Sequence, residues 1–284
     1  MLNQLSDSIY YMSNDNDRER PVLGLVCGEK YSLVIDGGNS VQHARDFIEE
    51  IRSLDVPPVQ YVVITHAHWD HFLGMNEFNA TIIVNRLTNK RLNDWRSYSF
   101  DDQSLREYVD ADMISAHCME IIQTEIPMRE SFILDKPGIV FKDSFQIDLG
   151  NKLCMLERIQ STHTDDSTVV YIPDDKTIFL GDSPYGTTTN KMFHFKQSLL
   201  SHMIQDIQMY DAEHFILGHE SICDREEMDV FWRELTTSSR AVTSTSLEQA
   251  IALFNKDQLR EPNGNELFFL KAFVNDQLLQ AQKK

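Results

Sequence analysis

Three histidines and one aspartate lie close together in the stretch THAHWDH, which spans residues 65–71. His66 and His68 are separated by one residue, and Asp70 and His71 are adjacent. Crowded imidazoles repel one another when protonated, whereas a divalent cation takes neutral imidazole nitrogen and carboxylate oxygen as ligands. In extended backbone His66 and His68 project to the same side and could grip one ion, and Asp70 and His71 could reach a second ion after a turn. The cluster therefore predicts a metal site.

The elements around this cluster are predicted from the pattern of apolar residues. The run at 61–65 is apolar and β-branched, which predicts a buried strand that ends where the histidines begin. The runs at 22–27 and 31–35 predict a hairpin, and Ser40 predicts the N-cap of a helix that ends near Leu54. Short β-type segments return in the second half, the first of them at 132–134. Strands that alternate with helices and then give way to hairpins favour a layered α/β protein with mixed sheets.

The composition argues against several classes of partner. The formal charge is −18, with 44 acidic against 26 basic residues, so the surface repels nucleic acid and anionic membranes. We find no signal-peptide pattern at the N-terminus, and no apolar run approaches the ~20 residues of a membrane span. The four cysteines are widely separated, which is typical of reduced thiols. We expect a cytoplasmic protein with a small-molecule substrate and without nucleic-acid or membrane partners.

Further motifs follow the cluster in a recognisable order. The segment QSTHTDDSTVVYIP places His163 before a β-type run, and KTIFLGDSPY places Asp182 after an apolar strand. FILGHE places His219 after another strand, and upstream YSLVIDGGNS ends a strand at Asp36. Together with the H-x-H-x-D-H stretch, these motifs resemble those of the metallo-β-lactamase superfamily over roughly residues 20–225.

The resemblance implies a fold and a set of ligands. The implied fold is a four-layer αββα sandwich of two mixed β-sheets flanked by helices. Three histidines would hold one metal ion, an aspartate with two histidines would hold the other, and a second aspartate would bridge the two ions. In that order the residues are His66, His68 and His163; Asp70, His71 and His219; and Asp182. The family role of Asp36 is to organise the loops beneath the site, although this residue equally suits the turn before Gly37 and Gly38.

The sequence departs from the family pattern around the third histidine ligand. Thr162 stands where the family has glycine, and Asp165 and Asp166 follow Thr164. We expect a bulkier loop that brings two extra carboxylates toward the metal ions. Such a loop would narrow the pocket or disfavour anionic substrates.

Two regions are expected to be additions to this fold. Charge and aromatic content rise over residues 86–120, where the spacing predicts a helical insertion. The last ~60 residues are predicted to be helical as well. We therefore expect a catalytic domain of this fold at 1–225 and a helical extension at 226–284 that packs on the same domain. Substrate preference or formation of a homodimer could be encoded in either addition.

The predicted chemistry is hydrolysis. Two divalent ions ~3.5–4 Å apart lower the pKa of a bridging water from about 15.7 toward ~7, which supplies hydroxide at neutral pH. Asp70 can orient this nucleophile and pass its proton to the leaving group. By resemblance to the lactonase and glyoxalase II branches, we expect cleavage of an ester, lactone or thioester in a small molecule. Two divalent ions are the expected cofactors, namely zinc, with manganese or iron as alternatives.

Other functions and residues stay open at this point. A phosphodiesterase or a nuclease similar to ribonuclease Z would use the same ligands, although the charge of −18 argues against a polyanionic substrate. An iron-dependent, persulfide-dioxygenase-like oxidoreductase is also compatible with them. Tyr185 is a candidate hydrogen-bond donor to a substrate carbonyl, or otherwise a packed tyrosine. His194 is either a substrate contact or part of a loop. The basic stretch at 85–96 is interpreted as a solvated helix face.

Overall fold

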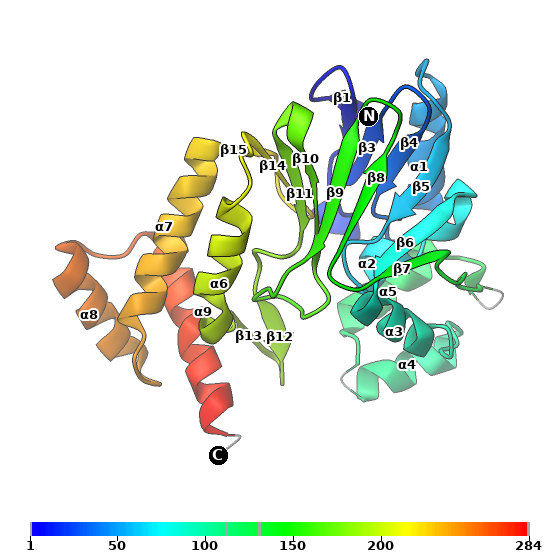
Figure 1. The fold of residues 1–284 in the computed structure, drawn as a ribbon. Helices are drawn as coiled ribbons and strands as arrows, with labels where there is room; N and C mark the ends of the chain where they lie inside the picture. Colours follow the sequence, from blue (N-terminus) through cyan, green and yellow to red (C-terminus); the bar gives the residue numbers. More distant parts are fainter. Residues whose placement is uncertain (1, 112, 130–131, 283–284) are drawn as a thin grey trace.

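Two β-sheets lie face to face in the computed structural model, which describes residues 2–111, 113–129 and 132–282 (Figure 1). Parallel pairing joins β4, β5, β6 and β7 of the first sheet, and antiparallel pairing joins the strands before β4. Across this sheet the order is β1 (Leu2–Gln4), β2 (Ile9–Met12), β3 (Leu23–Cys27), β4 (Ser32–Ile35), β5 (Val59–Val63), β6 (Thr81–Asn85) and β7 (Ile139–Phe141).

The second sheet is also mixed. Its order is β15 (Cys223–Asp224), β14 (His214–Leu217), β11 (Thr177–Gly181), β10 (Thr168–Ile172), β9 (Leu153–Arg158) and β8 (Ser144–Asp148). β11 and β14 run parallel, whereas the other neighbours in this sheet are antiparallel. A separate hairpin consists of β12 (Thr187–Thr189) and β13 (Met192–His194). Parallel neighbours place their carboxyl ends at the same edge of a sheet, so side chains that follow these strands gather there.

Helices cover the outer face of each sheet. The first sheet carries α1 (Val41–Arg52), α2 (Trp69–Phe72), α3 (Arg86–Trp95), α4 (Asp102–Asp110) and α5 (Ala116–Glu125). The second carries α6 (Gln197–Gln208) and α7 (Arg225–Ala241), and α8 (Leu247–Gln258) and α9 (Gly264–Ala281) pack on α7. The αββα sandwich of two mixed sheets that the resemblance implied is thereby confirmed.

Alternation along the strands explains these layers. Leu33 and Ile35 of β4 pack between the sheets, whereas Val34 faces the helical side, where Phe47 of α1 is fully buried. The same period of two recurs in neighbouring strands, because successive side chains of a strand point to opposite faces. α1 begins after Ser40, whose hydroxyl accepts the backbone N–H of His43 at 3.0 Å, as the N-cap prediction required.

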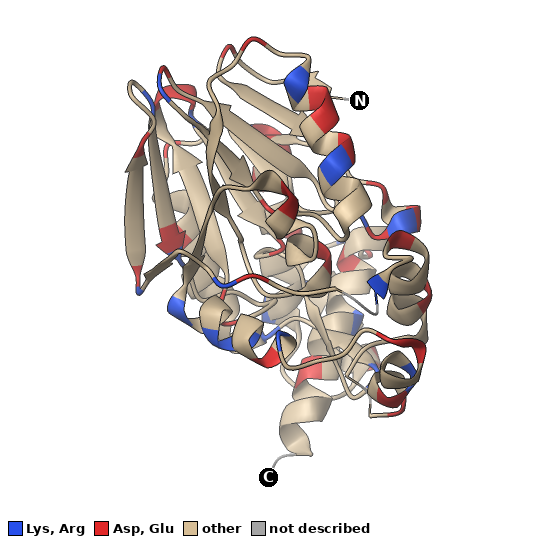
Figure 2. Ribbon diagram, turned by 90° about the vertical axis from the view of Figure 1, so that its right-hand side faces the viewer, with Lys and Arg blue, Asp and Glu red and all other residues tan. Residues whose placement is uncertain are grey.

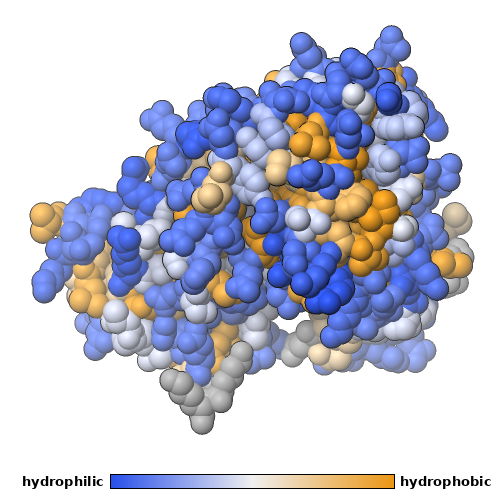
Figure 3. All heavy atoms as spheres, in the orientation of Figure 1, coloured by the Kyte–Doolittle hydropathy of each residue, from blue (hydrophilic) through white to orange (hydrophobic). Residues whose placement is uncertain are grey.

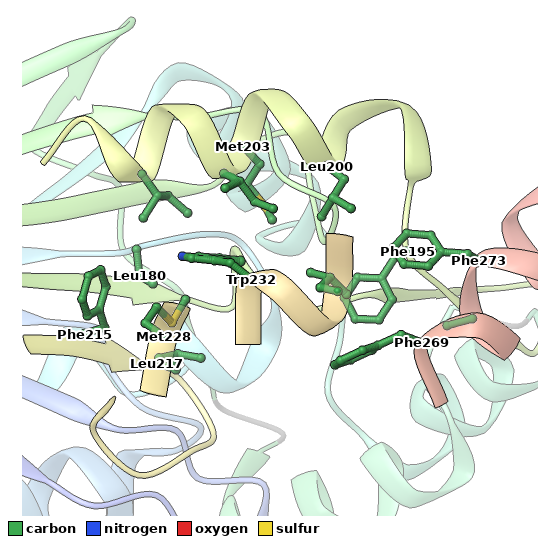
Figure 4. Close-up of a cluster of buried hydrophobic side chains, with 14 of the residues drawn as sticks. Leu180, Phe195, Leu200, Met203, Phe215, Leu217, Met228, Trp232, Phe269 and Phe273 are labelled. Atoms are coloured by element: carbon green, nitrogen blue, oxygen red, sulfur yellow. The ribbon is translucent and has the colours of Figure 1, made fainter. Parts of the chain in front are cut away.

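The outer core of the second sheet includes the C-terminal helices. Figure 4 shows side chains from α6, α7, α9 and the strands gathered in one cluster. Trp232 of α7 is 4% exposed, and Phe273 of α9 is fully buried and packs 5.5 Å from the ring of Phe195. Removal of a buried aromatic ring of this kind costs ~3–5 kcal/mol. The C-terminal helices are therefore part of the folded body.

One strand prediction is wrong. Residues 132–134 form no strand, and Phe132 instead packs its ring 5.1 Å from Phe100 beneath the inserted helices. An apolar run that packs by side chains alone cannot be distinguished from a strand by its pattern. The insertion consists of α3, α4 and α5 and ends at Glu125, later than expected, and residue 112 within it lies outside the described residues.

The surface separates charge from apolar area. Charged side chains lie mainly on helices and loops, and the strands carry few of them (Figure 2). The face in Figure 3 is largely hydrophilic but has an apolar patch over β7, β8 and β9, where Val140 and Leu153 are exposed. Within the described residues, no helix combines the length and the apolar composition that crossing a membrane requires.

Candidate metal centre

The seven predicted ligands meet at one edge of the sandwich. His66 and His68 follow β5, and the short helix α2 carries Asp70 and His71. From the second sheet, His163 lies in the loop between β9 and β10, Asp182 directly follows β11, and Gly218-His219 follows β14. All seven side chains are buried or half-buried. The fold thus joins residues that are up to 153 positions apart in the chain, from His66 to His219.

These residues form two groups that share one carboxylate. The first group is His66, His68, His163 and Asp182, and the second is Asp70, His71, Asp182 and His219. Within each group one potential ligand atom per residue lies within 4.8 Å of all the others. This is the pairing that the resemblance implied, with Asp182 in the bridging position.

The distances between potential ligand atoms suit small divalent ions. Asp182 Oδ2 lies 3.8 Å from His66 Nε2 and 3.5 Å from His163 Nε2. In the second group, His71 Nε2 lies 3.3 Å from Asp70 Oδ2 and 3.4 Å from Asp182 Oδ1. Four ligands at the ~2.0–2.1 Å of zinc–nitrogen and zinc–oxygen bonds are about 3.3 Å apart in a tetrahedron. Only small adjustments of side chains would bring these atoms to that geometry.

Buried atoms without partners point to the same conclusion. His66 Nε2, His71 Nε2 and Asp182 Oδ1 are buried and have no hydrogen-bond partner within the described chain. His163 Nε2 faces His68 Nδ1 at 2.9 Å, so two ring nitrogens converge. A buried polar atom without a partner carries a desolvation cost of ~1–3 kcal/mol. The donor set therefore fits two divalent cations, each of which would satisfy these atoms.

Asp36 fixes the orientation of two ligands from below. Its carboxylate accepts the backbone N–H of Thr65 at 2.8 Å, the Thr65 hydroxyl at 2.9 Å and Nδ1 of His71 at 2.8 Å. The Thr65 hydroxyl is also 3.2 Å from Nδ1 of His66. With Nδ1 of His66 and of His71 engaged by these hydrogen bonds, Nε2 is the ring nitrogen that faces the centre and would bind a metal ion. Of the two readings of Asp36, the structure supports the organising one, although the residue also adopts a turn conformation with φ +64°.

A second support holds the opposite side of the centre. His163 Nδ1 donates to the carbonyl of Gly186 at 2.5 Å, which frees its Nε2. The buried Thr162 donates its hydroxyl to the carbonyl of Tyr185 at 2.7 Å and joins two ligand-bearing loops. The backbone N–H of Ala67 donates to the carboxylate of Asp166 at 2.9 Å. The segments that carry His66, His163 and Asp182 are thus held from outside the centre.

The expectation for the two extra carboxylates is wrong. Asp166 is fully buried and accepts bonds from Ala67, Thr88 and Arg91, the last at 2.5 Å. Asp165 pairs with the same Arg91 at 2.5 Å. Neither carboxylate lines the cleft above the metal centre. The guanidinium of Arg91 turns both away from the pocket, so this arginine supports the ligand loop and belongs only partly to a solvated helix face.

Burial sets the charge of the first group. Desolvation lowers the pKa of His66 well below its usual value, and positive neighbours such as His71 lower it further. The pKa of His68 falls to about 4 through burial and the nearby His163, whose own pKa burial also lowers. These three histidines are therefore neutral at pH 7, which is the state that binds a metal ion.

Carboxylates set the charge of the second group. Burial alone would lower the pKa of His71, but Asp182, Asp70 and Asp36 together raise it well above its usual value. The pKa of His219 is raised to about 9, because Asp182 and Asp70 outweigh its burial. Without metal, this half of the centre is a cluster of ion pairs in which protons stand in for the cations.

Of the two candidate catalytic residues, Asp70 belongs to the second group and Tyr185 lies beside it. Asp70 Oδ2 lies 3.0 Å from Nε2 of His219, and Asp70 lines the cleft. Tyr185 also lines the cleft, and its hydroxyl accepts the backbone N–H of His219 at 3.3 Å. Trp69 contributes to the cleft wall, whereas Phe72 is fully buried in the core.

His194 does not reach the ligand set. Its Nδ1 lies 3.0 Å from a carboxylate oxygen of Asp276 in α9, and its Nε2 lies 3.0 Å from the hydroxyl of Thr189. Its side chain is 6% exposed and is absent from the cleft wall. The role of a substrate contact is thereby disfavoured, and the ring instead joins the β12–β13 hairpin to the C-terminal helix.

One requirement of the centre was missed in the sequence. A Cβ atom at Gly218 would lie 2.1 Å from Asp182 Oδ1 and 3.1 Å from His71 Cε1. Only glycine leaves room for the bridging carboxylate here. The position directly before a ligand histidine was the available signal, because backbone that approaches a metal site closely has no room for a side chain.

The chain is similar to known proteins of one superfamily. The family model described as the Metallo-beta-lactamase superfamily matches residues 21–219. A search of curated proteins finds no match. Among solved structures, a metallo-β-lactamase from Pontibacter korlensis is 16% identical, with a TM-score of 0.53 over 82% of this chain and 97% of that chain. The metallo-β-lactamase DIM-1 is 16% identical, with a TM-score of 0.53 over 81% of this chain and 93% of that chain.

A larger enzyme shares the fold as well. The inverting sec-alkylsulfatase Pisa1 from Pseudomonas sp. is 12% identical, with a TM-score of 0.62 over 90% of this chain, and the match spans only 43% of that enzyme. Identities this low show a common fold and leave the substrate undetermined. Superfamily members are mostly metal-dependent hydrolases that bind divalent metal ions, and the His/Asp cluster fits such a site. Since the family match extends from before Asp36 through His219, the chain belongs to the Metallo-beta-lactamase superfamily.

Proposed function

We propose that this protein is a hydrolase with two divalent metal ions, zinc in the first place, that cleaves an ester, lactone or thioester bond in a small molecule. The observation that carries the proposal is the pair of ligand groups that share Asp182. The Nε2 atoms of His66 and His71 face this centre because their Nδ1 atoms are hydrogen-bonded elsewhere. Two bound divalent ions would supply activated water at neutral pH and polarise the bond under attack.

Asp70 is the proposed proton carrier. It lies on the cleft side of the second ligand group and is 8% exposed, so a substrate can approach it. Burial would raise its pKa, but His71 and His219 hold the pKa well below its usual range. A carboxylate that stays ionised at neutral pH can accept a proton from the attacking water and deliver it to a leaving group.

Tyr185 is the proposed donor to the substrate carbonyl. Its hydroxyl accepts the N–H of His219, which leaves its own proton available to a group in the cleft. Burial, together with the nearby Asp182, raises the pKa of Tyr185 well above its usual value. The phenol therefore stays protonated and can donate a hydrogen bond to an oxyanion without becoming charged.

Metal analysis and a substrate panel test the proposal together. Protein purified without added metal is expected to hold two ions, and His68→Ala and Asp182→Ala should lower both metal content and turnover. His202→Ala on the exposed face of α6 is the matched control and should change neither. Unchanged metal stoichiometry in both ligand variants would refute the assignment of two ions.

The substrate panel distinguishes the proposed hydrolase from a nuclease-like phosphodiesterase and from an oxidoreductase. Simple p-nitrophenyl esters, γ-lactones and uncharged thioesters should be cleaved in preference to bis-p-nitrophenyl phosphate. A higher kcat/KM for the phosphodiester would move the protein to the nuclease-like class. Oxygen uptake with a persulfide, in iron-loaded protein, would move it to the oxidoreductase class.

A further inference from the structure

We infer that the substrate carries a long apolar group and no cluster of negative charges, and that the apolar group lies between two apolar walls contributed by the 86–120 insertion and by the C-terminal helices. This rests on the proposed function and goes beyond it, because it selects among the ester, lactone and thioester classes. The starting observation is a cleft of about 1620 Å³ that contains His68, Asp70 and His219 in its floor. Small-molecule sites commonly measure ~300–1,000 Å³, so the scissile bond occupies only a part of this cleft.

The insertion supplies the first wall. Trp95 of α3, Val109 of α4, and Met113 and Ile114 before α5 all line the cleft. Met113 is 49% exposed, which is unusual for a large apolar side chain unless it faces a binding site. In Figure 1 these helices flank the lower edge of the sandwich on one side, and the β12–β13 hairpin lies on the other.

The hairpin and the C-terminal helices supply the second wall. Phe193 of β13, Phe231 of α7, and Phe268 and Phe269 of α9 line the cleft. The rings of Phe193 and Phe268 are 5.4 Å apart, and those of Phe231 and Phe269 are 5.8 Å apart. Phe268 is 49% exposed although it belongs to this aromatic group. Residues from 225 onward lie beyond the 21–219 match, so most of this wall comes from outside the region that the family model covers.

This second wall is held in place before any ligand binds. His194 at the end of the hairpin contacts Asp276, as described above, and Asn275 donates from Nδ2 to the carbonyl of Phe193 at 2.8 Å. Asp276 also accepts the backbone N–H of Gln197 at 3.2 Å. Because α9 fixes the hairpin through buried polar contacts, the wall needs little ordering on binding, which favours affinity for a chain laid against it.

Acidic residues in the wall of the cleft disfavour substrates with several negative charges. Acidic residues among those described in its lining are Glu19, Asp70, Asp182, Glu220 and Glu227, whereas Lys191 is the lysine or arginine among them. Two divalent ions would bring four positive charges to the two ligand carboxylates, so the floor would be positive, and the acidic character of the cleft lies in the three glutamates, which are outside the ligand set. A substrate with phosphates or several carboxylates would meet like charge on its way to the centre. Coenzyme A thioesters are therefore disfavoured, and uncharged esters, lactones and thioesters are favoured.

A series of chain lengths tests the walls by turnover. For p-nitrophenyl esters from two to twelve carbons, kcat/KM should rise about 3- to 4-fold per methylene until the walls end. Phe268→Ala and Met113→Ala alter exposed side chains, so folding should persist. Each should lower kcat/KM for the ten-carbon ester about tenfold and leave the two-carbon ester within about twofold. Leu253→Ala, an exposed leucine of α8 outside the cleft, is the control.

Binding without turnover tests the same walls independently. Trp69 and Trp95 line the cleft, so titration of the protein with uncharged methyl ketones of increasing length should change tryptophan fluorescence. Affinity should rise with chain length and fall in Phe268→Ala. Affinity that is independent of chain length would overturn the inference, even if short esters are hydrolysed. Length-dependent binding without any hydrolysis would instead uphold the walls and overturn the proposed function.

Two thioesters with the same acyl chain but different charge test the effect of the wall glutamates. The decanoyl thioester of N-acetylcysteamine should exceed decanoyl-coenzyme A in kcat/KM by about tenfold or more, because only the second carries phosphates. Equal or reversed preference would contradict the inference that the substrate carries no cluster of negative charges.

Discussion

Asp36→Asn is the sharpest test of how the metal centre is organised. The replacement keeps the size of the side chain, and asparagine tolerates the left-handed backbone at this position, where φ is +64°. In the wild type both carboxylate oxygens accept, one from the Thr65 N–H at 2.8 Å and the other from the Thr65 hydroxyl and His71 Nδ1. An amide offers only one accepting atom. Either orientation of the amide therefore leaves its NH₂ group facing a donor.

The cost follows from this mismatch. One buried acceptor is lost, which corresponds to ~1–3 kcal/mol. If the NH₂ group faces His71, the imidazole relieves the conflict by moving its proton from Nδ1 to Nε2. That proton then blocks the atom that would bind metal, so affinity for the second ion should fall about 10- to 100-fold. The first ion should be affected less, because only His66 depends on the same Thr65 hydroxyl.

Competition with a chromogenic chelator at pH 7.5 measures both affinities. Asp174→Asn, an exposed carboxylate in the turn before β11, is the control and should bind both ions as the wild type does. Affinities within about threefold of the wild type for both ions in Asp36→Asn would refute the reasoning, since the carboxylate would then not determine which ring nitrogen of His71 carries the proton.

Four further outcomes are expected. Gly218→Ala should displace the Asp182 carboxylate and lower metal content, whereas Gly264→Ala, which has no atom within 4 Å of its added Cβ, should not. Because the pKa of His71 is raised and that of His219 is raised to about 9, both are protonated at pH 7, and metal binding should release about two protons, measurable by calorimetry in buffers of different ionisation heat. The raised pKa values of His71 and His219 stabilise the metal-free fold below pH ~6.5, and this stabilisation is lost as the pH rises through 9. The free energy of unfolding of the metal-free protein, measured in urea, should therefore decline between these two pH values. When free metal is present at 100 times its Kd, its removal should lower the free energy of unfolding by about 2.7 kcal/mol. An unchanged melting temperature after removal would contradict the expectation that metal binds tightly to the folded state and not to the unfolded chain.

The residues that gather at the candidate metal centre were predictable because metal binding restricts residue type severely. Only a few side chains can ligate zinc, so a histidine cluster at the end of an apolar run is informative without a structure. The helix after Ser40 was equally visible, since its capping signal is local. Both the chemistry and the local elements are therefore encoded in short stretches of the chain.

Features that depend on distant partners could not be predicted in the same way. Asp166 was expected to face the pocket, but Arg91, 75 residues earlier, turns it into the protein. His194 was a candidate substrate contact until the structure placed Asp276, 82 residues later, beside its ring. In each case the direction of a charged or polar side chain depends on a residue brought near only by folding. Sequence spacing contains no signal for such pairs.

The sharing of Asp182 has a mechanical consequence. His66, His68, Asp70 and His71 extend from the seven-stranded sheet, and His163, Asp182 and His219 extend from the six-stranded one. Two ions bound here would act as cross-links between the two halves of the sandwich, and would close loops of about 100 to 150 residues in the way that a disulfide does. The hydrophobic core between the sheets holds the body of the molecule together, and the ions would join the two sheets at the edge where the ligands gather. Occupancy of the centre would then determine how readily the halves separate.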